Sequence, residues 1–395
     1  MNLDHDLAIA QSRRAFLGRS ALGMGAAALG SLLARGAAPP RRGAAGGLPG
    51  LPHHPPRAKR VIFLYMSGGP SHLETFDFKP KLAEMDGKPM PESFTKGQPI
   101  AQLQNHELKC LGPRYKFAKH GQSGQEISEM LPWTAKLADD LCILRSMRTD
   151  QINHDPAHTV MNTGTSISGR PSMGSWVTYG LGSESDSLPA FCVLTSFAGR
   201  NPQPISQRMW GPGFLPGHVQ GVPLESKGDP VHYVRNPPGV GPRQQREVID
   251  AIRDLNSIRD ETAASAELRT RLAQYELAFR MQTSVPELMD VRDEPRHVLD
   301  LYGTKGADGT FASNCLLARR LAQRGVRFIQ LYHRDWDHHG AIKDHIKGTA
   351  AEVDRASAAL IRDLKQRDML KDTLVIFGSE FGRTPMAQGN GRDHH

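Results

Sequence analysis

Short, mainly apolar runs recur along the chain from residue 61 onward. The first, residues 61–66 (VIFLYM), contains no charged side chain and ends abruptly at a Ser-Gly-Gly turn. A strand that is buried on both faces of a sheet lacks the alternation of polar and apolar residues, so such a run predicts a central strand of a parallel sheet. Four further runs predict strands in the same way: residues 141–147, 191–194, 326–332 and 374–377.

Helical periodicity separates several of these runs. Ile346, Ala350, Val353, Leu360 and Leu364 fall on one face of a helix, and residues 311–324 form a second amphipathic segment. Alternation of strands and helices predicts an α/β fold with a mostly parallel central sheet flanked by helices. Residues 203–242 are rich in Gly and Pro, and the charged residues 243–281 predict one or two long helices. We therefore expect an insertion of loop and helix over about residues 203–290.

The first 59 residues predict export. Residues 12–17 (SRRAFL) form a twin-arginine pattern, and a weakly apolar run over residues 21–33 follows it. This run is shorter than the roughly 20 residues that span a bilayer. A chance Arg-Arg beside an apolar stretch is the alternative. We expect a signal region over residues 1–38, a flexible linker over 39–59 and a domain over 60–395. The predicted location is periplasmic or otherwise exported, with membrane contact only through the signal region.

Net charge argues against a nucleic-acid partner, whereas the cysteine content leaves the redox state open. The formal charge is +8, but the first 60 residues contain nine Lys or Arg and two Asp, so +7 of it lies there. The predicted domain is thus nearly neutral and lacks the basic surface that a nucleic-acid partner requires. The four cysteines form no C-x-x-C pair, and either free thiols or disulfides fit their spacing.

Carboxylates and imidazoles gather in three short islands near the end of the chain, residues 335–339, 379–383 and 391–395, and divalent metals bind such side chains. In an open α/β sheet, ligands bind beyond the carboxyl ends of the strands, where the first two islands are expected. A solvated polar loop is the alternative for the first island, and an ion pair with Arg383 is the alternative for the second. The candidate metal ligands are Asp337, His339, Glu380, Asp393 and His394, and zinc, calcium and manganese all remain open.

Two histidines are candidates for catalysis. His154 and His158 open a predicted helix after the run at 141–147, and their i, i+4 spacing places them on one face. Each could act as a base or as a further ligand, or could simply cap the helix. Ser67, in the glycine-flanked turn after the first run, could be a nucleophile, but a plain turn is favoured.

These motifs together resemble the DUF1501 family of exported bacterial proteins. The resemblance covers residues 60–395 and rests on the leader, SGGPSH at 67–72, WDHH at 336–339, EFGRTP at 380–385 and GRDH at 391–394. It implies a fold similar to that of alkaline phosphatases and sulfatases, which hydrolyse phosphate or sulfate esters at a metal centre. Family members continue beyond the last motif, so the chain is expected to be incomplete at its C-terminus. The chain lacks the acid after the first strand and the late-strand imidazole of that superfamily.

We therefore expect an exported metal-binding protein that hydrolyses sulfate or phosphate esters through a metal-activated water, with a polysaccharide as one candidate substrate. His154 or His158 would act as the base. The alternative is a non-catalytic exported protein that binds a glycan or a partner with a degenerate hydrolase fold. A third alternative is an incomplete gene product that does not fold.

Overall fold

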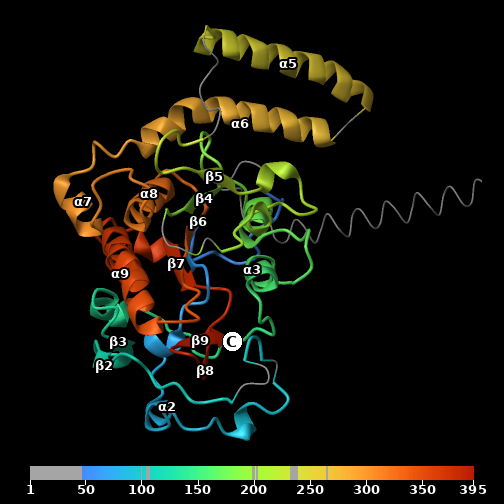
Figure 1. The fold of residues 1–395 in the computed structure, drawn as a ribbon. Helices are drawn as coiled ribbons and strands as arrows, with labels where there is room; N and C mark the ends of the chain where they lie inside the picture. Colours follow the sequence, from blue (N-terminus) through green and yellow to red (C-terminus); the bar gives the residue numbers. More distant parts are fainter. Residues whose placement is uncertain are drawn as a thin grey trace, which may run out of the picture.

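A five-stranded parallel sheet forms the centre of the protein in the computed structural model (Figure 1). The structure describes residues 47–98, 100–103, 107–197, 201, 203–231, 239–263 and 266–395. The strand order is β5-β4-β6-β1-β7, and every neighbouring pair is parallel. The strands are β1 (Arg60–Met66), β4 (Phe191–Thr195), β5 (Val222–Leu224), β6 (Phe328–His333) and β7 (Thr373–Gly378). The predicted α/β class and four of the five predicted strands are thereby confirmed.

Alternate residues of the central strand face two separate hydrophobic cores. Ile62 and Leu64 of β1 pack in a large core with α8 (Phe311–Gln323) and α9 (Ile342–Gln366). Phe63 and Tyr65 face the other side of the sheet, toward α3 (His154–Thr163) and α4 (Met173–Leu181). Both faces of the sheet are therefore covered, which explains why the strands read as continuous apolar runs.

The predicted strand over residues 141–147 was wrong. This segment is irregular, and Leu144 and Met147 are 67% and 73% exposed. The carbonyl of Leu141 accepts a hydrogen bond from the Gln125 side chain instead of from a neighbouring strand. An apolar run forms a central strand only where a neighbouring strand pairs with its backbone, and none of the described strands pairs with this segment.

The predicted insertion contains one part of the sheet. β5 lies within the Gly/Pro-rich stretch and pairs with β4 through Val222 and Leu224, so this stretch is not only surface loop. The predicted long helices are present as α5 (Pro242–Ala263) and α6 (Ala266–Met289). The two helices lie one above the other at the end of the molecule opposite β8 and β9, and the last turns of α6 enter the large core (Figure 1).

Smaller elements lie near the carboxyl end of the sheet. β8 (Arg383–Gln388) and β9 (Gly391–His394) form an antiparallel hairpin, and β2 (Phe117–His120) and β3 (Gln125–Ser128) form another. The short helices α2 (Pro80–Glu84) and α7 (Arg296–Tyr302) complete the described helices of α type. The β8–β9 hairpin returns the end of the chain to the mouth of the sheet.

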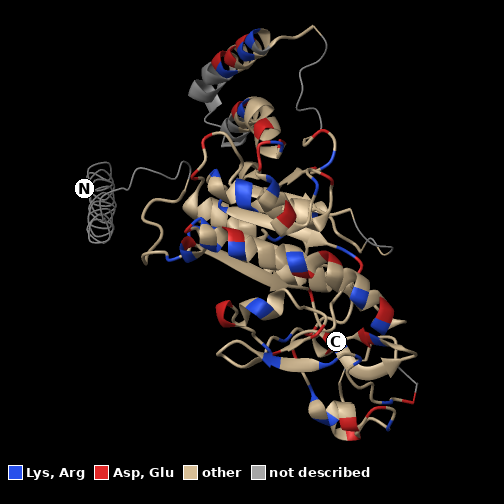
Figure 2. Ribbon diagram, turned by 90° about the vertical axis from the view of Figure 1, so that its left-hand side faces the viewer, with Lys and Arg blue, Asp and Glu red and all other residues tan. Residues whose placement is uncertain are grey.

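Basic and acidic residues are interspersed along the ribbon in the view of Figure 2. Among the helices that the structure describes, none is long and apolar enough to cross a membrane. The signal region and the first part of the linker lie outside the described residues. Residues 47–59 run as irregular chain, and Leu48 N donates to Gly180 O at the end of α4.

Candidate metal centre

Side chains from five segments meet at the carboxyl ends of three neighbouring strands. The turn after β1 contributes Ser67 and Gly68, the loop after β6 contributes Asp337 and His339, and the residue pair after β7 contributes Glu380. The start of α3 and the end of β9 supply His154 and His394. Parallel strands bring their carboxyl ends to one edge, so segments far apart in sequence converge there. Although α3 does not follow a strand as predicted, it reaches the same edge.

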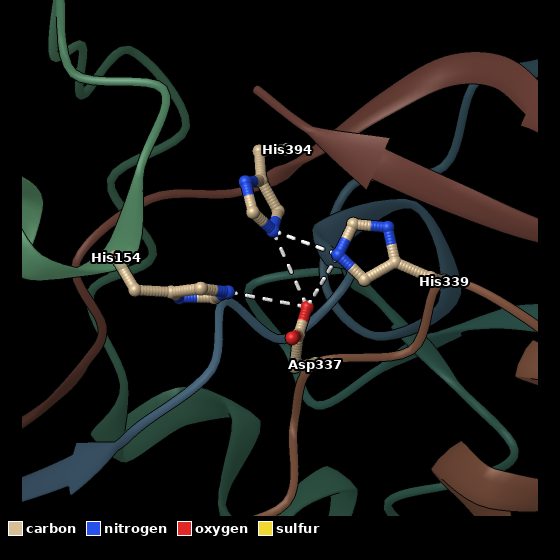
Figure 3. Close-up of side chains that lie close together, drawn as sticks. All are labelled: His154, Asp337, His339 and His394. Atoms are coloured by element: carbon tan, nitrogen blue, oxygen red, sulfur yellow. Dashed lines mark hydrogen bonds and ion pairs between the residues drawn. The ribbon is translucent and has the colours of Figure 1, made fainter. Parts of the chain in front are cut away.

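One carboxylate oxygen is the focus of the centre. Asp337 Oδ1 lies 3.2 Å from His154 Nε2, 2.8 Å from His339 Nε2 and 3.3 Å from His394 Nε2 (Figure 3). One donor atom from each of these four residues lies within 4.8 Å of all the others, so together they could hold a metal ion. Three predicted ligands and one predicted catalytic histidine therefore form a single cluster.

The remaining ring nitrogen of each histidine faces an oxygen acceptor. His154 Nδ1 lies 2.7 Å from Glu380 Oε1, His394 Nδ1 lies 2.8 Å from Ile152 O, and His339 Nδ1 contacts Gln388 Oε1. Each acceptor favours the tautomer with its proton on Nδ1, in which the Nε2 lone pair points into the cluster and could bind a metal; without a metal, Nε2 can donate to Asp337 only when the ring is protonated there. Histidines that ligate metals are commonly oriented in this way.

Two imidazole nitrogens of the cluster lie close together. His339 Nε2 and His394 Nε2 are 2.8 Å apart. This is the distance of an N–H···N hydrogen bond, so one of the two atoms carries a proton here, and a bound metal would replace that proton. His154 Nε2 is buried and forms no hydrogen bond of good geometry, so it also lacks a partner other than Asp337. The donor set thus fits a bound divalent metal.

The charge state of Asp337 is set by the histidines and the arginine around it. Burial alone would raise the pKa of Asp337, but hydrogen bonds from the three histidines and the Arg383 guanidinium outweigh it and hold the pKa well below its ordinary value. Arg383 is fully buried and donates to Asp337 Oδ1 at 2.6 Å and to Gly69 O at 2.8 Å. It also contacts the carbonyls of Gly68 and Arg392. Its donors are therefore committed to the protein.

Glu380 is a buried carboxylate that connects two histidines. Its Oε1 accepts hydrogen bonds from Gly68 N at 2.9 Å and from His154 Nδ1, and its Oε2 lies 3.5 Å from His158 Nδ1. Burial would raise its pKa, but the neighbouring His158 and the hydrogen-bonded His154 lower it instead. Its ion-pair partner is thus not Arg383, the alternative considered from the sequence. His154, His158 and Glu380 form a second group of possible metal ligands.

His158 lies behind the cluster. It is fully buried, its Nδ1 lies 2.7 Å from the Tyr65 hydroxyl, and its Nε2 lies 3.5 Å from Ser67 Oγ. Burial lowers its pKa, so the ring is neutral at pH 7. The two histidines predicted as catalytic thus occupy different places: His154 faces Asp337, while His158 faces the end of β1.

Asp393, a predicted ligand, lies beside the cluster with both oxygens occupied. Oδ2 accepts from the backbone N–H groups of Gln102 and Leu103 at 2.6 and 3.1 Å, and Oδ1 accepts from His394 N at 2.8 Å. Its nearest approach to a cluster histidine is 3.8 Å, from Oδ1 to His339 Nδ1. In this arrangement Asp393 holds the loop around residue 102 next to His394.

Sequence reasoning missed Asn201, Gln388 and Gly68. Asn201 Nδ2 donates to Asp337 Oδ2 at 3.1 Å, and Asn201 N donates to Asp335 Oδ1 at 3.2 Å. Asp335 is thereby directed away from the cluster, so the ligand pair has the Asp337-x-His339 spacing and not the i, i+4 spacing. The glycine pair after the first strand was a visible signal, whereas nothing in the sequence marks Asn201 or Gln388.

The comparisons identify one family. The model of a family described as "Protein of unknown function (DUF1501)" matches residues 58–395. No curated protein and no solved structure matches the chain significantly.

Proposed function

The chain belongs to the DUF1501 family, and from this premise and the geometry around Asp337 we propose that it is a metal-dependent hydrolase of sulfate or phosphate esters. The observation that carries the proposal is the convergence of three Nε2 atoms on one oxygen of Asp337. A sulfated or phosphorylated polysaccharide is the proposed substrate class. Export by the twin-arginine route, suggested by residues 12–17, belongs to the same proposal.

The donor set favours some metals over others. His154, His339, His394 and Asp337 offer three imidazole nitrogens and one carboxylate oxygen. Zinc accepts such a set at tetrahedral geometry, and manganese accepts it with further positions open to other ligands. Calcium requires six to eight oxygen ligands, which these four residues do not supply. We therefore propose zinc or manganese and not calcium.

Partial exposure supports a catalytic over a purely structural centre. The side chain of His339 is 25% exposed, and those of His154 and Asp337 are 13% and 12% exposed, so the cluster reaches solvent. Structural zinc sites are closed, whereas catalytic sites keep a position for water or substrate. A metal bound here would polarise an ester oxygen and lower the pKa of a bound water.

The protein groups around the cluster would orient its members and carry protons. Glu380 holds the His154 ring through Nδ1, and Arg383 keeps Asp337 ionised. His158 is neutral at pH 7, so it could accept a proton at Nε2, which faces Ser67 Oγ. Because His158 is fully buried, we assign it to proton transfer behind the centre and not to direct contact with substrate.

One observation favours the non-catalytic alternative, a protein that binds a glycan or a partner through the same fold. Arg383 is the cation next to Asp337, and its donors are occupied by Asp337 and backbone carbonyls. It is therefore not free to bind the developing negative charge of an ester in the transition state, as hydrolases of anionic esters require.

Metal content and hydrolysis together test the proposal. We expect the purified chain to contain about one zinc or manganese per molecule by elemental analysis, and Asp337→Asn or His339→Ala to abolish it. Asp335→Asn is the matched control, because Asp335 lies in the same loop but outside the cluster. Unchanged metal content in folded Asp337→Asn would overturn the site. If the two variants lose the metal but the metal-loaded wild type hydrolyses no aryl sulfate or phosphate, the binding role would be favoured.

A further inference from the structure

We propose that the protein has a second binding site, for a small organic anion, in a basic pocket on α9. The basic pocket is lined chiefly by Trp133, Lys136, Leu137, Arg355, Ala358 and Arg362. Its walls come from α9 and from the 3-10 helix η3 (Thr134–Asp140). The predicted ligand carries a sulfate or phosphate group on a ring or another compact apolar body.

The basic pocket is separate from the metal centre. Its residues are not members of either histidine cluster. α9 begins beside β9, where Ile342 N donates to Asn390 O. With a rise of 1.5 Å per residue, Arg355 and Arg362 lie about 20 and 30 Å along the axis from that end. A ligand in the pocket would therefore not touch the histidines.

Buried contacts hold the walls of the pocket in place. Both oxygens of Asp354, which is buried in α9, accept hydrogen bonds from the backbone N–H groups of Trp133 and Thr134 at 2.8 Å. Arg355 Nε donates to Leu301 O at 3.3 Å and so connects α9 to the end of α7. The pocket is thus a fixed junction of three elements.

The positive charge of the pocket is only partly balanced by acids. Within the described part of the chain, Lys136, Arg355 and Arg362 form no ion pair with a carboxylate, although the buried Asp354 lies near enough to Lys136 to attract it. Asp140 pairs with Lys365, Asp363 pairs with Arg319 and Arg367, and Asp354 binds backbone amides, while Arg355 donates to the carbonyls of Leu301 and Asp300. Three cations without a direct ion-pair partner around one cavity favour an anionic ligand.

Apolar surface between the cations defines the rest of the ligand. Trp133 is 37% exposed, with Lys136 Nζ 4.4 Å and the Arg355 guanidinium 5.4 Å from its ring centre. Leu137 and the buried Ala358 and Ala359 complete the surface without polar side chains. The cavity measures about 340 Å³, which is at the small end of ligand sites and suits one ring with its acid group.

Binding of non-hydrolysable probes tests the site in the full chain. We would titrate benzenesulfonate, phenylphosphonate and the uncharged benzyl alcohol by calorimetry. Expected results are that at least one acid binds, that benzyl alcohol does not, and that Lys136→Gln and Arg362→Gln each raise Kd about tenfold (~1.4 kcal/mol). Tighter binding of benzenesulfonate or of phenylphosphonate supports the proposal in either case, and it shows whether the pocket recognises a sulfate-like or a phosphate-like group.

Two controls locate the bound probe. Lys347→Gln removes an exposed lysine from α9 outside the pocket and should leave Kd unchanged. His339→Ala, which alters the metal centre, should also leave Kd unchanged. Unchanged binding in folded Lys136→Gln and Arg362→Gln, or lost binding in His339→Ala, would overturn the proposal. The binding of the probes to the basic pocket does not depend on whether the metal centre hydrolyses esters.

Discussion

Glu380 is the residue on which the two histidines of α3 depend. One carboxylate binds the Gly68 amide and His154 Nδ1, and it lies within 3.5 Å of His158. It is fully buried, so no water replaces these contacts if they are lost. The orientation of His154 toward Asp337 therefore depends on a group that does not itself enter the Asp337 cluster.

Replacing Glu380 with glutamine tests this dependence. An amide group keeps the size but removes the charge that holds the His154 proton on Nδ1. We expect Glu380→Gln to weaken zinc binding 10- to 100-fold, as measured by competition with a chromophoric chelator. Glu352→Gln is the control, since Glu352 also binds a histidine, His333, but is half-exposed and belongs to neither histidine cluster. Equal zinc affinity in Glu380→Gln and wild type would contradict the role.

The sequence identified most residues of the centre but not their contacts. Asp337, His339 and His394 were predicted from composition and spacing, and the structure brings them together. Asp393 belongs to the same sequence island, yet its oxygens bind backbone amides around residue 102. The direction of a carboxylate depends on the local turn and on what packs against it. The composition of a sequence segment reveals neither the local turn nor the packing around it.

At the scale of the element, the turn after β1 controls how closely the loop after β6 can approach. Gly68 has φ +119°, a conformation that favours glycine, and an added Cβ would lie 2.6 Å from Asp337 N. The position therefore requires glycine both for its backbone and for its space. The loop that carries two of the four proposed ligands packs directly against this turn.

Gly68→Ala should accordingly disturb the centre as well as the fold. We expect it to lower the free energy of unfolding by about 3 kcal/mol and to reduce bound metal, because the Asp337 loop must shift. Gly124→Ala provides the control: Gly124 has φ +65° but open space around its Cβ, so only backbone strain of about 1 kcal/mol applies. Chemical denaturation and elemental analysis of both variants measure the difference. Equal losses in the two variants would show that the close approach to the loop has no effect.

The first residues of β1 are held to the start of β7 by an ion-pair group. Asp372 accepts from Lys59 Nζ at 2.9 Å and from Arg60 at 2.8 Å. Burial would raise the pKa of Asp372, but the two cations lower it. A lowered folded-state pKa means that Asp372 stabilises the fold above its ordinary pKa, and that this contribution is lost as pH falls through the lowered value.

Asp372→Asn should therefore destabilise the protein in a pH-dependent way. Near pH 7 we expect a loss of about 1 kcal/mol in the free energy of unfolding, and the difference from wild type should vanish as the solution is acidified. Urea denaturation at a series of pH values measures it. Asp368→Asn, which removes an exposed ion pair with Lys371, should show little effect at any pH. A pH-independent loss in Asp372→Asn would contradict the electrostatic origin.

Apolar runs predicted the central strands well because both faces of this sheet are covered by helices. The same signal failed at residues 141–147, where the chain lies on the surface. It also missed β5, a three-residue edge strand that contains Pro223. Strand pairing depends on neighbours that a local pattern does not reveal, so edge strands and surface runs are the segments where such predictions fail.

At the scale of the whole molecule, the chain has one compact sheet with a long helical pair at one end and the metal centre at the other (Figure 1). The leader and the beginning of the linker, on which the prediction of export rests, lie outside the described residues. Export therefore stays a prediction. The family match covers residues 58–395, and the predicted domain boundaries stay a prediction as well.

The four residues of the Asp337 cluster come from α3, the loop after β6 and β9, and they meet only in the folded sheet. An unfolded chain would scatter these donors, so metal would bind the native state and not the denatured one. Mass action then makes stability a function of free metal concentration, by about 2.7 kcal/mol at one hundred times Kd. We expect the melting temperature to rise steadily with added zinc and to lose this dependence in His394→Ala. A wild-type melting temperature that does not change with zinc would contradict metal binding by the native state. The free concentration of a metal ion would thus determine the free energy of unfolding of this protein.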